Sequence, residues 1–379
     1  MSENTNTTKR RSAIQIMGSL IGLVKPLLHI MLAAIILGTL GYLCAIFLTI
    51  LAGQVIMHGL LTGVAGMIVP VDNMWRVFTP VKTIITVMIV IAVLRGILHY
   101  VEQYCNHFIA FKLLAIIRHK VFAALRKLCP AKLEGRDKGN LISIITTDIE
   151  LLEVFYAHTI SPIAIATLTS IIMVIFIGRY HWLAGVIALV AYLIVGVVIP
   201  MWNGKRGSQK GMEFRTNFGE LNSFVLDSLR GLDETIQYGQ GEKRKEQMSE
   251  HSKNLAGMQE SLSKMEGSQR SFTNMVILLA SFGMLALTIW LYDKGAMGFE
   301  GILTCTIAMM GSFGPVVALS SLSNNLNQTL ASGERVLSLL EETPLVEEIP
   351  GDVETSGAES MEHEFTGAEA EHVTFAYDN

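Results

Sequence analysis

Apolar residues in this sequence are gathered into six long runs, which are separated by stretches rich in charged and polar residues. Each run approaches or exceeds the ~20 residues with which a helix crosses a ~30 Å hydrocarbon layer. The runs fall at residues 27–55, 81–109, 154–178, 182–201, 272–292 and 298–322. Backbone groups in lipid must bond within their own segment, and no run alternates as a barrel strand does. The pattern predicts an all-α membrane protein with six transmembrane helices.

Composition supports this prediction. Hydrophobic residues make up 51% of the chain and charged residues only 16%, whereas a soluble domain has about 25% charged residues. Taken alone, the first run is also compatible with a buried core helix or a signal peptide. Its length, however, exceeds the ~7 to 15 apolar residues of a signal peptide core. We therefore expect residues 1–26 to remain as a cytoplasmic N-terminal segment.

The distribution of Lys and Arg predicts the orientation. With a cytoplasmic N-terminus, four basic residues fall outside, Arg95 falls within a span, and the rest face the cytoplasm, as the positive-inside rule requires. The four outside are Arg76, Lys82, Arg179 and Lys294. Six crossings return the C-terminus to the cytoplasm, so we expect a multi-pass protein of the inner (plasma) membrane. None of the four cysteines lies in an outer loop, and no disulfide is indicated.

The connections between the spans are unequal in length. Outer connections after the third and fifth spans are short turns, whereas the cytoplasmic ones are long and rich in helix formers. Residues 108–128 continue the second span, and 208–230 and 242–270 are further expected helices, with Gly204 and Gly207 in a basic turn before them. About 25 helical residues reach roughly 40 Å below the membrane. Such a lever suits a pump better than a simple channel.

The sixth span and its continuation have their own pattern. Ser312, Gly314 and Pro315 predict a kink. The polar run 320–329 that follows either lines a water-filled path or emerges into the cytoplasm, and we favour emergence from Asn324 onward. The helical pattern then continues to about Leu340.

Three further divisions of the chain follow from composition. Residues 27–340 form the six-helix domain, and 341–367 form an acidic linker that has no Lys or Arg and contains helix-breaking Pro and Gly. Residues 368–379 end in EHVTFAYDN, where Val373, Phe375 and Tyr377 alternate with polar or small residues. This alternation predicts the first strand of a new soluble domain.

One polar stripe lies within a span. Arg95, His99, Glu102 and Asn106 follow one another at i, i+4, i+7 and i+11, so they share one face of the second helix. Charge so close to hydrocarbon is costly and is expected to face a cavity, a partner helix or the inner interface. The alternative is that Arg95 extends to the cytoplasmic surface and Glu102 is already in water. His158, near the inner end of the third span, is ambiguous in the same way.

Signatures of soluble enzymes do not occur in the sequence. No G-x-x-x-x-G-K-[ST] phosphate-binding loop is present, and His and Cys lack the spacing of metal ligands. We assign no catalytic residue and no metal, and we expect this chain alone not to hydrolyse ATP.

The residues that follow the sixth span carry a family resemblance. The string LASGERVLSLLEETP, followed by VTFAY, resembles the ABC exporters in which a membrane domain and an ATPase domain share one polypeptide. Within Ala331 to Glu341, the residues Arg335, Val336, Leu339, Leu340 and Glu341 fall on the family's helix of the form A-x-x-R-[VI]-x-x-[LI]-[LI]-[DE], with Ser332 at its alanine position. The resemblance implies that Tyr377 stacks on adenine, since an aromatic face accepts a base without hydrogen bonds. A core or edge-strand tyrosine is the alternative.

The resemblance also assigns two cytoplasmic turns, 131–142 and 229–241, to the coupling helices that pass ATPase motion to the spans. The second turn is similar to the pattern G-x-x-E-x-x-x-[YF]-G. The coupling residues so implied are Glu134, Gly135, Gly231, Glu234, Tyr238 and Gly239.

A narrower resemblance covers the second and third spans. It is to the half-transporters of cytochrome bd assembly, the CydC/CydD type, which are associated with thiol and haem transport. The residues on the pattern R-G-x-x-R-Y-x-E-R-x-x-x-H are Arg95, Gly96, Tyr100, Glu102 and His107, with Tyr104 at one of its unspecified positions. His99 and Gln103 replace arginines of the pattern, so the site is less positive than in that subfamily. The resemblance implies a substrate path along Arg95, His99, Glu102, Asn106 and His107.

Together these observations predict the membrane half of an ATP-driven, alternating-access exporter of thiol or haem. The family works with a second half-transporter, as a homodimer or heterodimer, among membrane lipids, and uses ATP and magnesium in the full-length protein. No nucleic acid is implied. The rival substrates are a lipid, drug or peptide. A rival from another class is a membrane sensor or permease without ATP hydrolysis.

Overall fold

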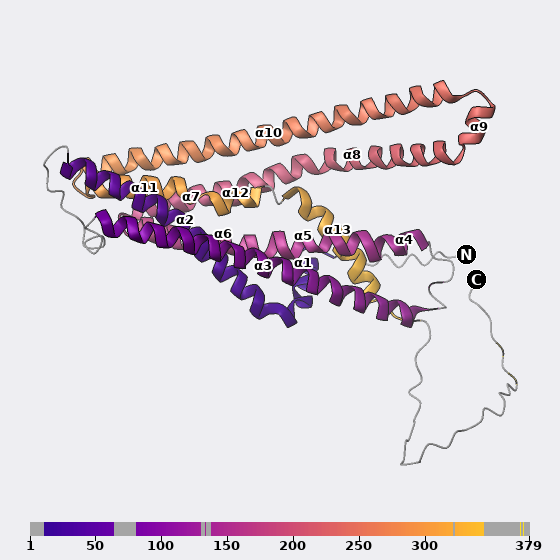
Figure 1. Cartoon of the computed structure of the whole chain (residues 1–379), viewed down its shortest axis with the longest axis horizontal. Helices are drawn as coiled ribbons and strands as arrows, with labels where there is room; N and C mark the ends of the chain where they lie inside the picture. Colours follow the sequence, from indigo (N-terminus) through magenta and orange to yellow (C-terminus); the bar gives the residue numbers. More distant parts are fainter. Residues whose placement is uncertain are drawn as a thin grey trace, which may run out of the picture.

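A computed structural model describes residues 11–63, 81–129, 133, 138–320, 323–344, 372 and 374. The described elements are helical, and six helices are long and apolar enough to cross a membrane. Most run nearly parallel and form an elongated bundle (Figure 1). The predicted all-α fold with six spans is confirmed.

The first two spans are long helices that extend beyond their apolar runs. A short helix α1 (Ala13–Leu23) precedes α2 (Leu28–Gly63). The second span lies in α3 (Val81–Leu128), which is unbroken for 48 residues, or roughly 70 Å. The continuation of the second span past residue 108 is therefore confirmed. It persists because strong helix formers fill this stretch and no Pro interrupts it.

The third span is a helix interrupted by wider turns. It begins with α4 (Lys138–Ser143) and α5 (Ile149–Phe155) and ends with α6 (Ser161–Gly178). Single π-helical turns, Ile144–Asp148 and Tyr156–Ile160, join these pieces. Such turns often lie at functional positions.

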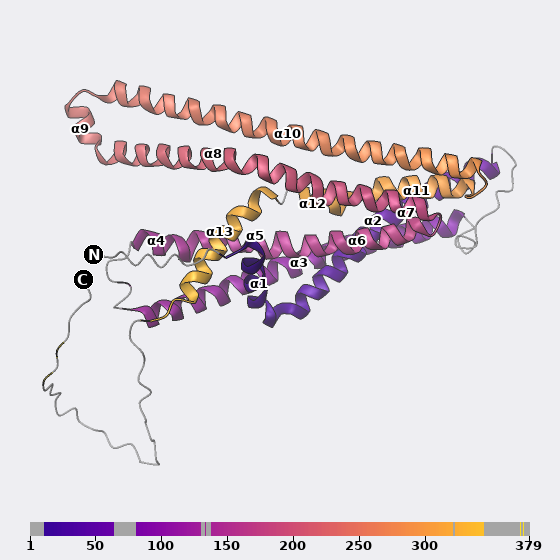
Figure 2. The ribbon, with the colours of Figure 1, turned by 180° about the vertical axis from the view of Figure 1, so that it is seen from behind.

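The fourth and fifth spans form a hairpin. Helix α7 (Trp182–Leu193) passes through a π-turn, Ile194–Val198, into α8 (Ile199–Arg230). After α9 (Leu232–Gln237), α10 (Gly241–Asp293) returns for 53 residues, about 80 Å. Helices α8 and α10 run side by side to α9, which lies at the far tip beyond α4 (Figures 1 and 2).

The predicted basic turn at Gly204 and Gly207 is wrong, because both glycines lie inside α8. Glycine costs a helix only about 1 kcal/mol relative to alanine. The helix continues on both sides of the two glycines, and α8 as a whole packs against α10.

The sixth span breaks where Ser312, Gly314 and Pro315 predicted a kink. Helix α11 (Phe299–Gly311) ends, and α12 (Gly314–Ser320) begins after two residues. Helix α13 (Ser323–Leu340) follows, as the helical pattern to Leu340 predicted. The predicted strand and most of the predicted acidic linker lie outside the described residues.

Two apolar cores hold the helices together. One joins α1, the start of α2, the latter half of α3, α5 and α13, around Leu113, Leu152 and Phe155. The other joins α2, the start of α3, α6, α7, α10 and α11, around Met173 and Met309. The polar stripe of α3 lies between the stretches of α3 that contribute to these cores.

Candidate functional site

The polar stripe of α3 divides into a buried part and an accessible part. Glu102 and Asn106 are only 5% and 4% exposed, whereas Arg95 and His99 are exposed. His107 is half-buried. The four residues predicted to share one face of the helix therefore point into two environments.

Glu102 organises the buried part. Asn106 Nδ2 donates a hydrogen bond to Glu102 Oε1 at 2.5 Å, and Gln103 Nε2 donates to Oε2 at 2.9 Å. His99 Nδ1 lies 3.3 Å from the same Oε2. Both carboxylate oxygens thus have partners, which is the condition for burying such a group at acceptable cost.

Arg95 carries the opposite charge to Glu102 and lies about two turns before it on the stripe. The structure instead places His99, three residues away, against the carboxylate. Within the part of the chain that the structure describes, Arg95 forms no hydrogen bond or salt bridge. Its exposure fits both a cavity-lining side chain and one that extends to the interface.

Helix α2 has a glycine where it packs against Glu102. A Cβ atom at Gly38 would lie 2.4 Å from Ile165 Cδ1, closer than real Cβ atoms approach, and 3.0 Å from Glu102 Cγ, which is a tight contact. One turn further, a Cβ at Gly41 would touch Leu98 Cβ at 3.7 Å. Gly38 therefore lets α2 pack closely where the carboxylate is buried, which the sequence analysis missed, whereas the contact at Gly41 would be an ordinary one for a Cβ atom.

The stripe continues from α3 to the third span. His107 Nδ1 lies 4.0 Å from Glu153 Oε1, and the rings of His107 and His158 meet edge to face with centroids 5.9 Å apart. His158 lies in the π-turn Tyr156–Ile160 and is exposed. Among the described residues, no group of three His, Cys, Asp or Glu side chains is arranged to hold a metal ion.

Ser312, one of the residues that predicted the kink in the sixth span, is buried. Its Oγ shares a short hydrogen bond with the hydroxyl of Tyr192 and donates to Met309 O at 3.0 Å. Ser312 therefore ties α11 to α7 and does not line a water-filled path.

A groove of about 270 Å³ lies between α6, α7 and α12. Its walls are almost entirely apolar, and the hydroxyls of Thr167 and Tyr192 are engaged elsewhere in hydrogen bonds to Ile163 O and Ser312. Gly196, in the π-turn of the fourth span, forms part of the wall. The apolar runs gave no signal for this groove because it depends on how three helices meet.

The second predicted coupling turn is well defined. Gly231 ends α8, and its carbonyl accepts bonds from the amide and hydroxyl of Thr235 at 3.0 and 2.7 Å. At the other end of α9, Gly239 has φ of +63°, and the amides of Gly239 and Gln240 donate to Ile236 O and Thr235 O. This is a Schellman motif, in which a left-handed glycine closes a helix.

The tip formed by this turn is apolar and accessible. Tyr238 is 72% exposed and Ile236 68%, and Leu229 and Leu232 are exposed beside them. Glu234 lies in the first turn of α9, where the helix dipole stabilises a negatively charged side chain. Clustered apolar side chains at the end of a long hairpin are typical of a docking surface.

Three predicted residues cannot be placed. Glu134 and Gly135 of the first coupling turn, and Tyr377, lie outside the described residues.

Comparison with known proteins identifies the architecture. The family model described as "ABC transporter transmembrane region" matches residues 27–316. A similar protein is the "Probable ABC transporter ATP-binding/permease protein" of Haemophilus influenzae, 40% identical over 97% of this chain and 63% of its own length.

More distant relatives differ in what their names say they transport. The "Glutathione/L-cysteine transport system ATP-binding/permease protein CydC" of Haemophilus influenzae is 22% identical over 76% of this chain and 49% of its own length. The "ATP-dependent lipid A-core flippase" of Escherichia coli K12 is 23% identical over 71% of this chain and 47% of its own length. The chain thus spans between about half and two thirds of the relatives it matches.

Proposed function

This chain belongs to the ABC transporter transmembrane family, and from that premise we propose that it forms the substrate path of an ATP-driven exporter and couples ATP hydrolysis to alternating access. The observation that carries the proposal is the α8–α9–α10 hairpin. Helix α10 alone is about 80 Å long, against ~30 Å of hydrocarbon, and it is continuous from an apolar span to a distant tip. A continuous helix of this length transmits a displacement at its tip directly to the span.

The tip of the hairpin is the proposed contact with an ATPase domain. Ile236 and Tyr238 offer apolar surface, and the capped ends of α9 hold its orientation. Glu134, Gly135 and the remaining first coupling turn are proposed to make the equivalent contact. ATP and magnesium are proposed to act in the full-length protein, with Tyr377 stacked on adenine. The 379 residues contain no phosphate-binding loop, so no step of hydrolysis is assigned to them.

A second half-transporter is the proposed partner, as a homodimer or a heterodimer. Two features support it. The α3 face beside Arg95 and Tyr100 is exposed, and so are large apolar or aromatic side chains along the same helix, namely Ile97, Tyr104 and Phe108. The proposed location is the inner (plasma) membrane with both termini cytoplasmic, supported by the distribution of Lys and Arg.

For the substrate we propose a thiol or haem compound, handled along Arg95, His99, Glu102, Asn106 and His107. Glu102 is buried and its oxygens are occupied by Asn106, Gln103 and His99, so the accessible charge of the stripe is the Arg95 guanidinium. An exposed guanidinium favours a substrate with a carboxylate or phosphate. The CydC relative supports a thiol, whereas the flippase relatives support a lipid as the rival.

The test uses full-length protein, with its partner if it has one, in liposomes. We expect ATP hydrolysis that glutathione, cysteine or haem stimulates, and that Arg95→Gln makes less sensitive to these compounds while basal hydrolysis persists. Stimulation by a lipid, drug or peptide alone would replace the thiol or haem proposal. Absence of any ATP hydrolysis would instead favour a sensor or permease.

A further inference from the structure

Helix α13, which leaves the sixth span, is in close contact with the N-terminal helix α1. Gly333 provides the point of closest approach, because a Cβ atom there would lie 2.9 Å from Leu20 Cδ1 and 3.4 Å from Ile16 Cγ2. Leu20 is fully buried in this contact. The two helices are far apart in sequence, so their contact depends on the tertiary fold.

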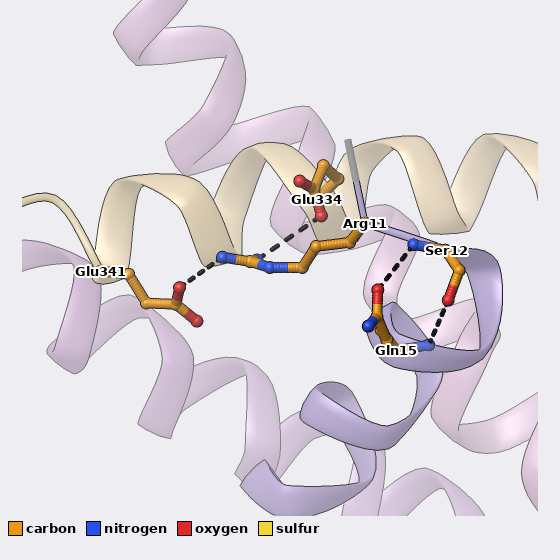
Figure 3. A network of polar contacts seen from close by, with 5 residues as sticks. All are labelled: Arg11, Ser12, Gln15, Glu334 and Glu341. Atoms are coloured by element: carbon orange, nitrogen blue, oxygen red, sulfur yellow. Dashed lines mark hydrogen bonds and ion pairs between the residues drawn. The ribbon is translucent and has the colours of Figure 1, made fainter. Parts of the chain in front are cut away.

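Charged side chains bridge the same two helices. Arg11 Nη1 lies 3.5 Å from Glu334 Oε2, and its Nη2 forms a short ion pair with Glu341. Glu334 and Glu341 are seven residues apart, so they project from one face of the helix about two turns from each other. Figure 3 shows the guanidinium lying between the two carboxylates. One arginine thus spans the final turns of α13.

The backbone beside Arg11 is fixed by a helix cap. Ser12 is the N-cap of α1, and its Oγ accepts a bond from Gln15 N at 3.3 Å while Gln15 Oε1 accepts one from Ser12 N at 3.0 Å (Figure 3). This capping box orients the residue that precedes it. Arg11 is therefore aimed at α13 by local structure, and its side chain is only 25% exposed.

Residues of the third span bond to both α1 and α13. Ser332 Oγ donates to Asp148 Oδ1 at 2.9 Å, and Arg335 Nη1 lies 2.7 Å from Asp148 Oδ2. The hydroxyl of Tyr156 donates to Leu20 O at 2.9 Å. Helices α1 and α13 and the segment that contains Asp148 and Tyr156 therefore form a closed triangle.

From these contacts we propose that Arg11, Glu334 and Glu341 form an ionic latch, which fastens α1 to α13 and restrains the helix that continues from the sixth span. The latch makes the N-terminal helix part of the body that must move whenever α13 moves. Its charges are partly accessible, so the latch opens more readily than the buried Leu20–Gly333 contact. The inference does not depend on which substrate is transported.

Hydrogen exchange measured by mass spectrometry on the whole chain in lipid nanodiscs tests the latch. Arg11→Gln is expected to speed exchange about two- to fivefold in residues 12–24 and 334–341, the range for loss of a partly exposed ion pair. Glu341→Gln should have a smaller effect, since Glu334 remains. Glu250→Gln, which removes an exposed carboxylate of α10, is the matched control and should leave both segments unchanged.

Two further measurements distinguish the latch from a general loss of charge. The double variant Arg11→Gln with Glu341→Gln should exchange no faster than Arg11→Gln alone, because both changes remove the same interaction. Arg11→Lys should fall between wild type and Arg11→Gln, because a lysine cannot engage two carboxylates in the planar geometry of a guanidinium. Unchanged exchange in Arg11→Gln, additive effects in the double variant, or wild-type exchange in Arg11→Lys would each overturn the proposal.

Discussion

Replacing Glu102 by leucine tests whether the α3 stripe is a buried hydrogen-bonded unit. The change removes the acceptor for Asn106, Gln103 and His99. His99 is exposed and Gln103 half-buried, so water replaces much of what they lose. Asn106 is only 4% exposed and cannot turn its amide to solvent. An unsatisfied buried donor of this kind costs about 1–3 kcal/mol, which sets the expected loss of unfolding free energy.

The double variant Glu102→Leu with Asn106→Leu gives the decisive comparison. Replacing both partners of a buried hydrogen bond by apolar groups is nearly neutral, so the double variant should be more stable than Glu102→Leu alone. The assay is the midpoint of thermal unfolding in detergent, where about 1–3 kcal/mol corresponds to several degrees.

Glu250→Leu, at an exposed position of α10, controls for loss of a carboxylate. The reasoning fails if Glu102→Leu lowers the midpoint no more than this control. It also fails if the double variant is less stable than the single one.

Three further predictions concern other parts of the chain. Gly239→Val forces a branched residue to adopt φ of +63°, so it should lower the free energy of unfolding by about 1–3 kcal/mol and speed amide exchange around the turn. Gly241→Ala is the control and should change little, because there is open space around the added Cβ. Asp148→Ala should lower the free energy of unfolding by about 1–3 kcal/mol, seen as a lower thermal midpoint, because two α13 donors lose their acceptor, and Asp148→Asn should lower it less. Ile236→Asp at the exposed tip should change the free energy of unfolding by no more than about 0.5 kcal/mol but lower ATP hydrolysis by the full-length protein several-fold. Unchanged hydrolysis would exclude the tip as a docking surface.

Local patterns predicted most of the helical architecture. Apolar run length marked six spans, and the scarcity of breakers in residues 108–128 predicted the extension of α3. Gly314 and Pro315 marked the break in the sixth span. These features depend on neighbours within a few residues, and propensity and periodicity report on such neighbours. The same logic misjudged Gly204 and Gly207, where packing along a long hairpin outweighed glycine's preference.

The candidate site was only partly predictable. Spacing placed Glu102 and Asn106 on one face of a helix, but it did not show that His99 would approach the carboxylate in place of Arg95. Burial of Glu102 depends on Gly38 of another helix, and the contact of Arg11 with α13 joins residues more than 300 positions apart. Such contacts follow from how helices assemble, which a single sequence does not specify.

The π-turns of the third and fourth spans have a consequence for tolerance to deletion. Each π-turn, such as Ile194–Val198, accommodates one residue more than a regular α-helical turn. Removing one residue there restores regular geometry while the helices on both sides keep their faces toward their neighbours. The same deletion in the uninterrupted α10 would rotate everything beyond it by about 100°. The third and fourth spans should therefore tolerate the loss of one residue at a π-turn, whereas the fifth span should not tolerate such a change in length.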